Sequence, residues 1–172
     1  MKKEKNKIPR LIIYAMIAAA VIAADQATKY AAATFLRGIE TFPLIKGVLH
    51  LTYVENRGAA FGMLSNSRWV FMILSSVALV GMAAFTLINR NGRMMTNVAV
   101  AMIFGGGFGN MIDRLAKGFV VDFIDFRIIN FWVFNVADSF VTIGCGVLIL
   151  SLIMGEIDSR KKKKAPGGET GE

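Results

Sequence analysis

The segment FNVADSF, residues 134–140, places Asn135 and Asp138 at the start of a long apolar run. A second carboxylate, Asp122, lies in the segment GFVVDFIDFRI, which precedes that run. An ionisable side chain in an apolar, membrane-like stretch is rare and points to a functional site. Two carboxylates held together in a low-dielectric environment do not both ionise readily, so one keeps a proton while the other is charged. Such a pair can activate water for attack on a peptide carbonyl and donate a proton to the carbonyl oxygen.

The elements that must position these residues are four apolar runs in a chain of 172 residues, of which 55% are hydrophobic. Each run approaches the roughly 20 residues that an α-helix needs to cross a bilayer. The basic start and small residues of the first run also fit a cleaved signal peptide, but three further spans follow it. We predict an all-α integral membrane protein: one four-helix domain over 1–160 and a disordered basic cytoplasmic tail over 161–172. The predicted helices cover about 11–34, 70–88, 96–114 and 133–157.

The formal net charge of +8 is distributed in a way that predicts topology and gives no support to nucleic-acid binding. Basic clusters precede the first run, separate the second from the third, and follow the fourth. The positive-inside rule therefore predicts that both termini and the short middle loop are cytoplasmic, with residues 35–68 and 115–132 outside. Trp69 and Trp132 fall at the predicted outer ends, as in an aromatic belt.

The two external segments contain candidate strands. GVLHLTYVEN is rich in β-branched and aromatic residues and predicts a strand or hairpin at the membrane surface. The glycines of NRGAAFG, residues 56–62, then permit a tight return toward the second helix. In GFVVDFIDFRI, the alternation places Val120, Asp122, Ile124 and Phe126 on one face of a strand. We expect these segments to form a small sheet beside the helix ends.

The predicted topology brings the polar residues of the apolar runs to one level near the outer membrane boundary. Within each run the later ones follow the first by three or four residues, so they share one helix face with it. They are Asp25 and Lys29 in the first run, Asn110, Asp113 and Arg114 in the third, and Asn135 and Asp138 in the fourth.

Several of these residues have simpler interpretations. Asp25 and Lys29 can form a structural ion pair, and Arg114 can extend to lipid phosphates. We expect Asp113 to be solvated and Asp125 to lie on the surface. The glycines of FGGGFGN, residues 104–110, favour close helix packing over phosphate binding.

Other classes of function find less support. The chain has one cysteine and one histidine, Cys145 and His50, so an intrachain disulfide and two-cysteine metal motifs are excluded. Carboxylates within spans also serve as proton relays, and the alternative function is a small proton-coupled membrane transporter. That alternative is weakened because the inner halves of the predicted spans are nearly free of ionisable residues.

Five blocks, DQATK, VENRGAAFG, GNMIDRL, VVDFIDF and FNVADS, resemble in order the signature blocks of the lipoprotein (type II) signal peptidases, from about Asp25 to Gly144. The resemblance implies a bacterial aspartic endopeptidase with four transmembrane helices and a small extracytoplasmic β-cradle. Its substrate would be a prolipoprotein, cleaved just before a cysteine that carries diacylglyceryl.

The same resemblance implies that Asp122 and Asp138 are the catalytic dyad, with no metal and no cofactor. It assigns site-supporting or substrate-binding positions to Asp25, Lys29, Asn56, Gly58, Asn110, Arg114, Asn135 and Ala137. It also implies inhibition by the cyclic peptide globomycin. We expect a multi-pass monomer in the cytoplasmic (inner) membrane, in contact with phospholipid, with its active site near the outer leaflet.

Overall fold

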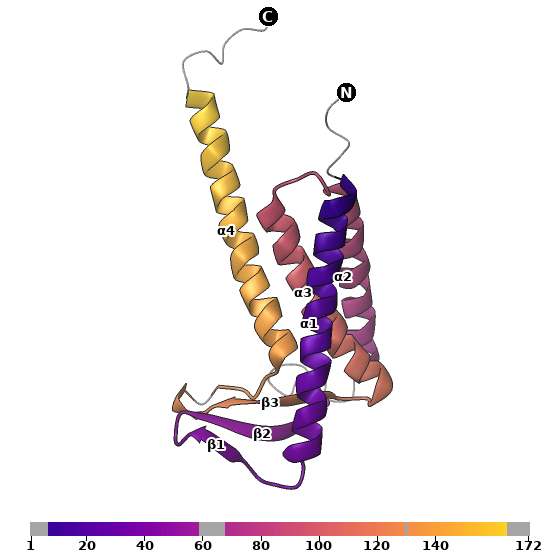
Figure 1. Cartoon of the computed structure of the whole chain (residues 1–172), viewed down its shortest axis with the longest axis vertical. Coiled ribbons are helices and arrows are strands. Elements are labelled where there is room, and N and C mark those ends of the chain that lie inside the picture. Colours follow the sequence, from indigo (N-terminus) through magenta and orange to yellow (C-terminus); the bar gives the residue numbers. More distant parts are fainter. Residues whose placement is uncertain (1–6, 59–67, 130, 165–172) are drawn as a thin grey trace, which may run out of the picture.

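The computed structural model describes residues 7–58, 68–129 and 131–164 of the chain. Figure 1 shows long helices side by side, with a small sheet across one end of them. The elements are α1 (Lys7–Phe35), β1 (Phe42–Ile45), β2 (Leu49–Asn56), α2 (Arg68–Ile88), α3 (Met94–Ala116), β3 (Val120–Phe126), a short 3₁₀ helix (Arg127–Ile129) and α4 (Val136–Lys164). This helical architecture with a small sheet confirms the predicted fold class.

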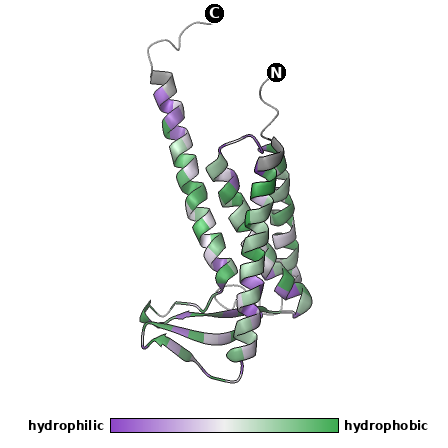
Figure 2. Cartoon of the chain, viewed as in Figure 1, coloured by the Kyte–Doolittle hydropathy of each residue, from purple (hydrophilic) through white to green (hydrophobic). Residues whose placement is uncertain are grey.

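Apolar composition along the helices marks the protein as membrane-embedded. Within the described residues, three helical stretches are long and apolar enough to cross a membrane, namely Arg10–Phe35, Met94–Ala116 and Val136–Lys161. In α2, which runs over Arg68–Ile88, the described apolar stretch is Met72–Ile88. Figure 2 shows hydrophobic residues along the helices and hydrophilic ones at the sheet end and at the far end of α4.

Two boundaries of α4 differ from the prediction. The helix begins at Val136 because the backbone of Phe134 pairs with β3: the Phe134 N–H donates to the Ile124 carbonyl at 3.0 Å, and the Ile124 N–H donates back at 2.8 Å. At the other end the helix continues to Lys164, where basic residues are favourable near the negative end of the helix dipole. The predicted tail is therefore helical over 161–164. Residues 165–172 and the glycine return at 59–62 lie outside the described residues.

Glycines allow α3 to pack closely against α1 and α4. A Cβ added at Gly105 would lie 2.8 Å from the Val21 Cβ of α1. One added at Gly106 would collide with the carbonyl oxygen of Ala137 in α4. Small residues permit such close approach between membrane helices, which confirms the packing interpretation of these glycines.

The sheet is antiparallel in the order β1-β2-β3. Val54 pairs with Asp122 and Asn56 with Val120 in the β2–β3 register, so Asn56 and Asp122 are diagonal neighbours across the two strands. Val121 and Phe123 of β3 pack on Ala32 and Leu36, at the end of α1. This packing fixes β3 against the helix bundle and, with it, the position of Asp122.

Candidate functional site

Asp122 and Asp138 lie at the junction of the sheet and the helices, and each of their four carboxylate oxygens accepts an N–H. The Asn135 side-chain amide donates to Asp122 Oδ1 at 2.7 Å, and the Asn56 amide donates to Asp122 Oδ2 at 2.9 Å. The Asn110 amide donates to Asp138 Oδ1 at 2.8 Å. The backbone N–H of Asn135 donates to Asp138 Oδ2 at 3.2 Å. All four donors are neutral amides, so each carboxylate keeps lone pairs for a proton or a water.

Asn135 connects the two carboxylates and also begins α4. Its Oδ1 accepts the backbone N–H of Asp138 at 2.9 Å, while Asp138 accepts the backbone N–H of Asn135. These reciprocal bonds form a capping box, with Asn135 as the N-cap and Asp138 three residues later. The backbone that starts the helix therefore also fixes the carboxylate of Asp138.

The amide orientations of Asn56 and Asn110 are determined by their other partners. Asn56 Oδ1 accepts the N–H of Gly58 at 3.1 Å, which directs its NH₂ group toward Asp122. Asn110 Oδ1 accepts from the Lys29 ammonium at 2.7 Å, which directs its NH₂ group toward Asp138. Each asparagine can therefore present only a donor to its carboxylate.

Lys29 lies at the centre of a fully buried ionic cluster. Its ammonium is 2.9 Å from Asp25 Oδ2 and 3.2 Å from Asp113 Oδ2, and all three side chains are 0% exposed. With Asn110 as the third acceptor, the three N–H donors of the ammonium are satisfied. A buried charge is tolerated only when it is paired and hydrogen-bonded in this way.

The expectation that Asp113 is solvated is wrong. Besides Lys29, its carboxylate binds the Lys117 ammonium at 3.0 Å and accepts the Val121 N–H of β3 at 3.2 Å. Asp113 thus links α1 and α3 to the strand that carries Asp122. The signal in the sequence was Lys29 itself, because an ammonium within an apolar run has three N–H donors and needs further acceptors besides Asp25.

Asp25 joins α1 to the start of α4. Its Oδ1 accepts the backbone N–H of Ala137 at 3.0 Å, one of the donors that a helix leaves unpaired in its first turn. Ala137 is 0% exposed, and its backbone carbonyl lies against Gly106. Gln26, which the sequence analysis did not single out, donates to Asp25 Oδ2 at 3.1 Å and to the Gly109 carbonyl at 3.1 Å.

Two further charged residues lie near the site. Arg114 donates to the Asn110 carbonyl at 3.5 Å, and its guanidinium interacts electrostatically with Asp138, Asp122 and Asp113. Asp125, expected on the surface, is instead 9% exposed. Thr52 of β2 and Arg127 of the 3₁₀ helix both donate to its Oδ2, at 2.8 and 3.0 Å, so neither of these partners belongs to the dyad.

Burial raises the pKa of Asp122 to about 6, and the nearby charge of Asp138 adds to that rise. Hydrogen bonds from Asn56 and Asn135, together with the charge of Lys29, act in the opposite direction. A carboxyl group with such a pKa exchanges a proton near neutral pH, as acid–base chemistry requires. Among the described residues, no group of three His, Cys, Asp or Glu side chains is placed to hold a metal ion.

Known proteins are similar to this chain over most of its length. Residues 17–154 match the family described as signal peptidase (SPase) II. The chain is 41% identical over 150 residues to the lipoprotein signal peptidase of Brevibacillus brevis, which covers 87% of this chain and 99% of that protein. It is 42% identical over 149 residues to the lipoprotein signal peptidase of Clostridioides difficile, and the alignment covers 87% of this chain and 100% of that protein.

A solved structure of a bacterial membrane enzyme, determined by the in meso method at 2.3 Å resolution, has the same fold. It superposes with a TM-score of 0.75 and 34% sequence identity, over 93% of this chain and 94% of that one. Three findings lead to one conclusion. They are the membrane-embedded helical fold with a small sheet, the family match over most of the chain, and the alignment with relatives over nearly their full length. The chain belongs to the signal peptidase II family of membrane hydrolases.

Proposed function

We propose that this protein removes the signal peptide from prolipoproteins, cleaving just before a diacylglyceryl-modified cysteine, with Asp122 and Asp138 as the catalytic dyad. The observation that carries the proposal is the placement of both carboxylates at the sheet–helix junction. Each of their four oxygens accepts a hydrogen bond from a neutral N–H. Neutral donors hold both groups in place without neutralising them. Relatives of this chain are named for lipoprotein signal peptide cleavage, which supports the choice of substrate.

The surroundings of the two carboxylates support different roles. Asp138 lies in the first turn of α4, where the positive end of the helix dipole favours a negative charge. Asp122 is on a strand, and burial raises its pKa to about 6. We therefore assign the ionised role to Asp138 and the protonated role to Asp122.

The reaction then needs only these two groups and a water. Asp138 takes a proton from the water as its oxygen attacks the scissile carbonyl, and Asp122 donates its proton to the carbonyl oxygen. The tetrahedral intermediate collapses when the amide nitrogen receives the proton held by Asp138 and the hydroxyl returns its proton to Asp122. The carbon–nitrogen bond breaks, and the dyad regains its starting protonation.

The proposed depth of the site fits a lipid-anchored substrate. The sheet lies across one end of the helices (Figure 1), and we assign that end to the outer leaflet of the cytoplasmic membrane, with both termini in the cytoplasm. A diacylglyceryl chain would then stay in that leaflet while the peptide bond reaches Asp122 and Asp138. We expect a monomer to suffice, because the site is built from one chain, and we expect globomycin to inhibit it.

The transporter alternative requires ionisable groups along the membrane normal. Among the described residues, the buried charged side chains are Asp25, Lys29, Asp113, Asp122 and Asp125. The first four are joined by the contacts of the site, and the last lies within the sheet. No chain of buried charges across the described part of the bundle supports a proton path.

The decisive experiment is cleavage of a diacylglyceryl-modified prolipoprotein by the purified protein in detergent, followed by gel shift. Asp122→Asn and Asp138→Asn should each lower the rate constant by about 100-fold or more, because each removes an acid–base group. In each variant, the new asparagine side chain also places an NH₂ group opposite an amide donor that the native carboxylate accepts. A thermal unfolding curve should therefore accompany every assay, to show that the loss occurs in folded protein.

Asp125→Asn is the matched control, since it removes a carboxylate from the same strand without touching the site. It should leave cleavage within about twofold of the wild type. Near-normal cleavage by either Asp122→Asn or Asp138→Asn would refute the dyad. If Asp125→Asn is folded but does not cleave, cleavage depends on the integrity of the sheet, and the losses in the other two variants cannot be assigned to the dyad.

A further inference from the structure

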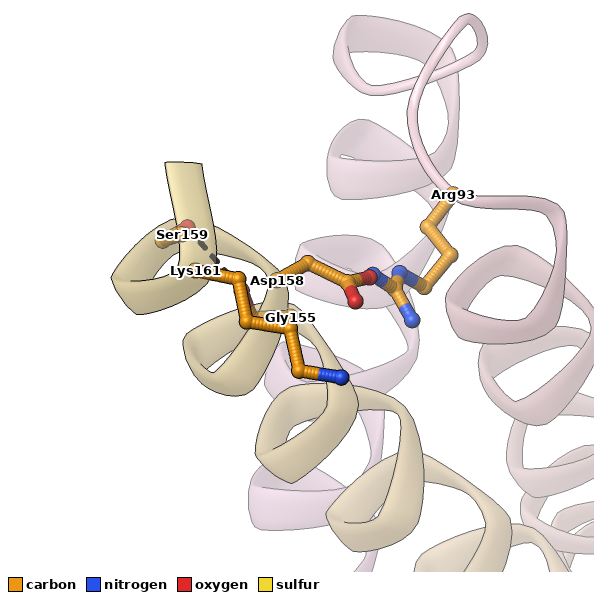
Figure 3. Close-up of a pocket in the computed structure, with 5 residues that line it drawn as sticks. All are labelled: Arg93, Gly155, Asp158, Ser159 and Lys161. Atoms are coloured by element: carbon orange, nitrogen blue, oxygen red, sulfur yellow. Dashed lines mark hydrogen bonds and ion pairs between the residues drawn. The ribbon is translucent and has the colours of Figure 1, made fainter. Parts of the chain in front are cut away.

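A second polar site lies between Arg93, just before α3, and the last turns of α4. Figure 1 shows these parts at the end of the helices opposite the sheet. The site is a cavity of about 540 Å³ between the start of α3 and the end of α4. Its lining residues, drawn in Figure 3, are Arg93, Gly155, Asp158, Ser159 and Lys161. No part of the proposed cleavage site contributes to it.

The cavity lies at the boundary between membrane and water. Arg93 directly precedes the apolar span that begins at Met94. Lys161 lies in the charged stretch of α4 that follows Ile157, the last apolar residue of that helix. Below it, toward the membrane centre, α4 exposes the apolar side chains of Leu152, Ile153 and Met154. A polar cavity above an apolar helix surface matches the headgroup and acyl chains of a phospholipid.

The charges in the cavity favour an anion that also carries hydrogen-bond donors. Arg93 pairs with Asp158 at 2.5 Å through one terminal nitrogen, which leaves the other N–H donors of the guanidinium available to a ligand. Lys161 adds a second cation, so the lining carries a net charge of +1. Ser159 donates its hydroxyl to the Gly155 carbonyl at 2.9 Å, so its oxygen can accept. Asp158 is 58% exposed and can accept as well.

We propose that this cavity binds the headgroup of an anionic phospholipid of the phosphatidylglycerol type. The phosphodiester would lie on Arg93 and Lys161, and the headgroup hydroxyls would donate to Asp158 and Ser159. The single negative charge of such a lipid balances the net charge of the lining. Basic cavities between membrane helices on the cytoplasmic side bind anionic headgroups by this chemistry.

Gly155 provides the sharpest test, because it shapes the cavity without contributing charge. An added Cβ would have the Arg93 guanidinium, at 4.0 Å, as its only neighbour within that distance. A leucine would therefore occupy the cavity without colliding with the backbone. The matched control is Gly146→Leu, on the same helix, where an added Cβ meets nothing within 4 Å.

The measurement uses the full chain in phosphatidylcholine nanodiscs that contain a small fraction of photoactivatable phosphatidylglycerol. Crosslinks to the peptides around Arg93 and Lys161 are quantified by mass spectrometry. Gly155→Leu should lower this labelling by about tenfold, as the loss of one good contact does, while Gly146→Leu should match the wild type. Equal labelling of Gly155→Leu and wild type would refute a shaped site, because attraction by surface charge alone does not depend on Gly155.

Two charge variants separate lipid binding from helix packing. Arg93→Gln and Asp158→Asn both remove the ion pair between α3 and α4, yet they should act in opposite directions. Arg93→Gln should weaken labelling by about fivefold, because it removes a cation. Asp158→Asn should strengthen labelling, because it frees the Arg93 guanidinium while the asparagine Oδ1 can still accept a headgroup hydroxyl. A loss in both variants would mean that the ion pair only holds the helices together, and the proposal would be wrong.

Competing compounds identify the source of the phosphate. Unlabelled phosphatidylglycerol should suppress the crosslink, and phosphatidylethanolamine should do so weakly, because it has no net charge. Suppression by inorganic phosphate at the same concentration would overturn the assignment to a lipid. Lipid labelling is measured without cleavage, so failure of the proposed cleavage reaction would not change its result.

Discussion

At the residue scale, the site depends on asparagines as much as on aspartates. Asn135 contacts both carboxylates, while Asn56 and Asn110 each hold one of them. Because an amide NH₂ carries no charge, these contacts orient Asp122 and Asp138 without removing the proton exchange that the proposed reaction needs. Fixed arginine or lysine partners would instead stabilise both carboxylates as anions.

The pH dependence of cleavage follows from the role assigned to Asp122. Its pKa is raised to about 6, and it must be protonated to donate to the substrate carbonyl. We therefore expect kcat/KM to fall as pH rises above about 6, approaching tenfold per pH unit. We expect bound substrate to bury Asp122 further, which would shift the fall in kcat to higher pH.

Initial rates across a pH series, at low and at saturating substrate, would measure both profiles. Asp125→Asn should reproduce the wild-type curve, because Asp125 does not contact the dyad. A value of kcat/KM that rises with pH through this range would mean that Asp122 acts as a base, and the assigned roles would have to be exchanged.

At the scale of elements, the site requires α3 and the start of α4 to approach closely. Gly106 is the contact point, since an added Cβ there would collide with the Ala137 carbonyl and lie 2.8 Å from the Val141 Cγ2. The backbone of α4 cannot yield without moving Asp138. Helix spacing and carboxylate geometry are therefore set by the same contact.

Gly106→Ala should destabilise the protein by about 1–3 kcal/mol, the usual effect of overpacking, and lower cleavage by about tenfold or more because the Asn110–Asp138 bond lengthens. Thermal unfolding in detergent and the gel-shift assay would measure the two effects. The adjacent Gly107→Ala is the control, since its nearest contact would be Leu79 Cδ2 at an ordinary 3.4 Å. Equal effects of both substitutions would contradict a specific role for Gly106.

The sequence predicted the elements better than the contacts between them. The helices and β3 follow from local signals, namely apolar runs of spanning length and an alternating pattern. The burial of Asp113 depends on Lys29, which lies on another helix, and the start of α4 depends on the pairing of Phe134 with Ile124. β1, all of whose residues are exposed, has no pattern of its own and forms by pairing with β2. Such non-local contacts leave no periodic signal in the chain.

At the scale of the whole molecule, the two proposed sites lie at opposite ends of the helices. The sheet end carries the carboxylate pair, and the other end carries Arg93 and Lys161. The positive-inside rule assigns the second end to the cytoplasm. Each proposed ligand, a lipid-anchored peptide and an anionic headgroup, then enters from a different leaflet.

Cysteine labelling tests this orientation. In a Cys145→Ala background, Lys46→Cys at the sheet end should react with a membrane-impermeant maleimide in spheroplasts, and Arg90→Cys should not. Both wild-type residues are exposed, so accessibility in the fold does not limit the reaction. Arg90→Cys should react once the membrane is permeabilised. Labelling of Arg90→Cys alone in intact spheroplasts would show that the protein has the opposite orientation in the membrane.

The ion pair between Asp25 and Lys29 has a consequence for biosynthesis. Both residues belong to α1 and are one helical turn apart, whereas Asn110, Asp113 and Ala137 belong to helices that leave the ribosome later. The nascent first helix can thus enter the bilayer with its two charges already paired, before Asn110, Asp113 or Ala137 has been synthesised. Exchange of Lys29 for a residue without charge would leave a lone carboxylate in that helix. The defect would then arise when the first helix inserts into the membrane, before the active site has formed.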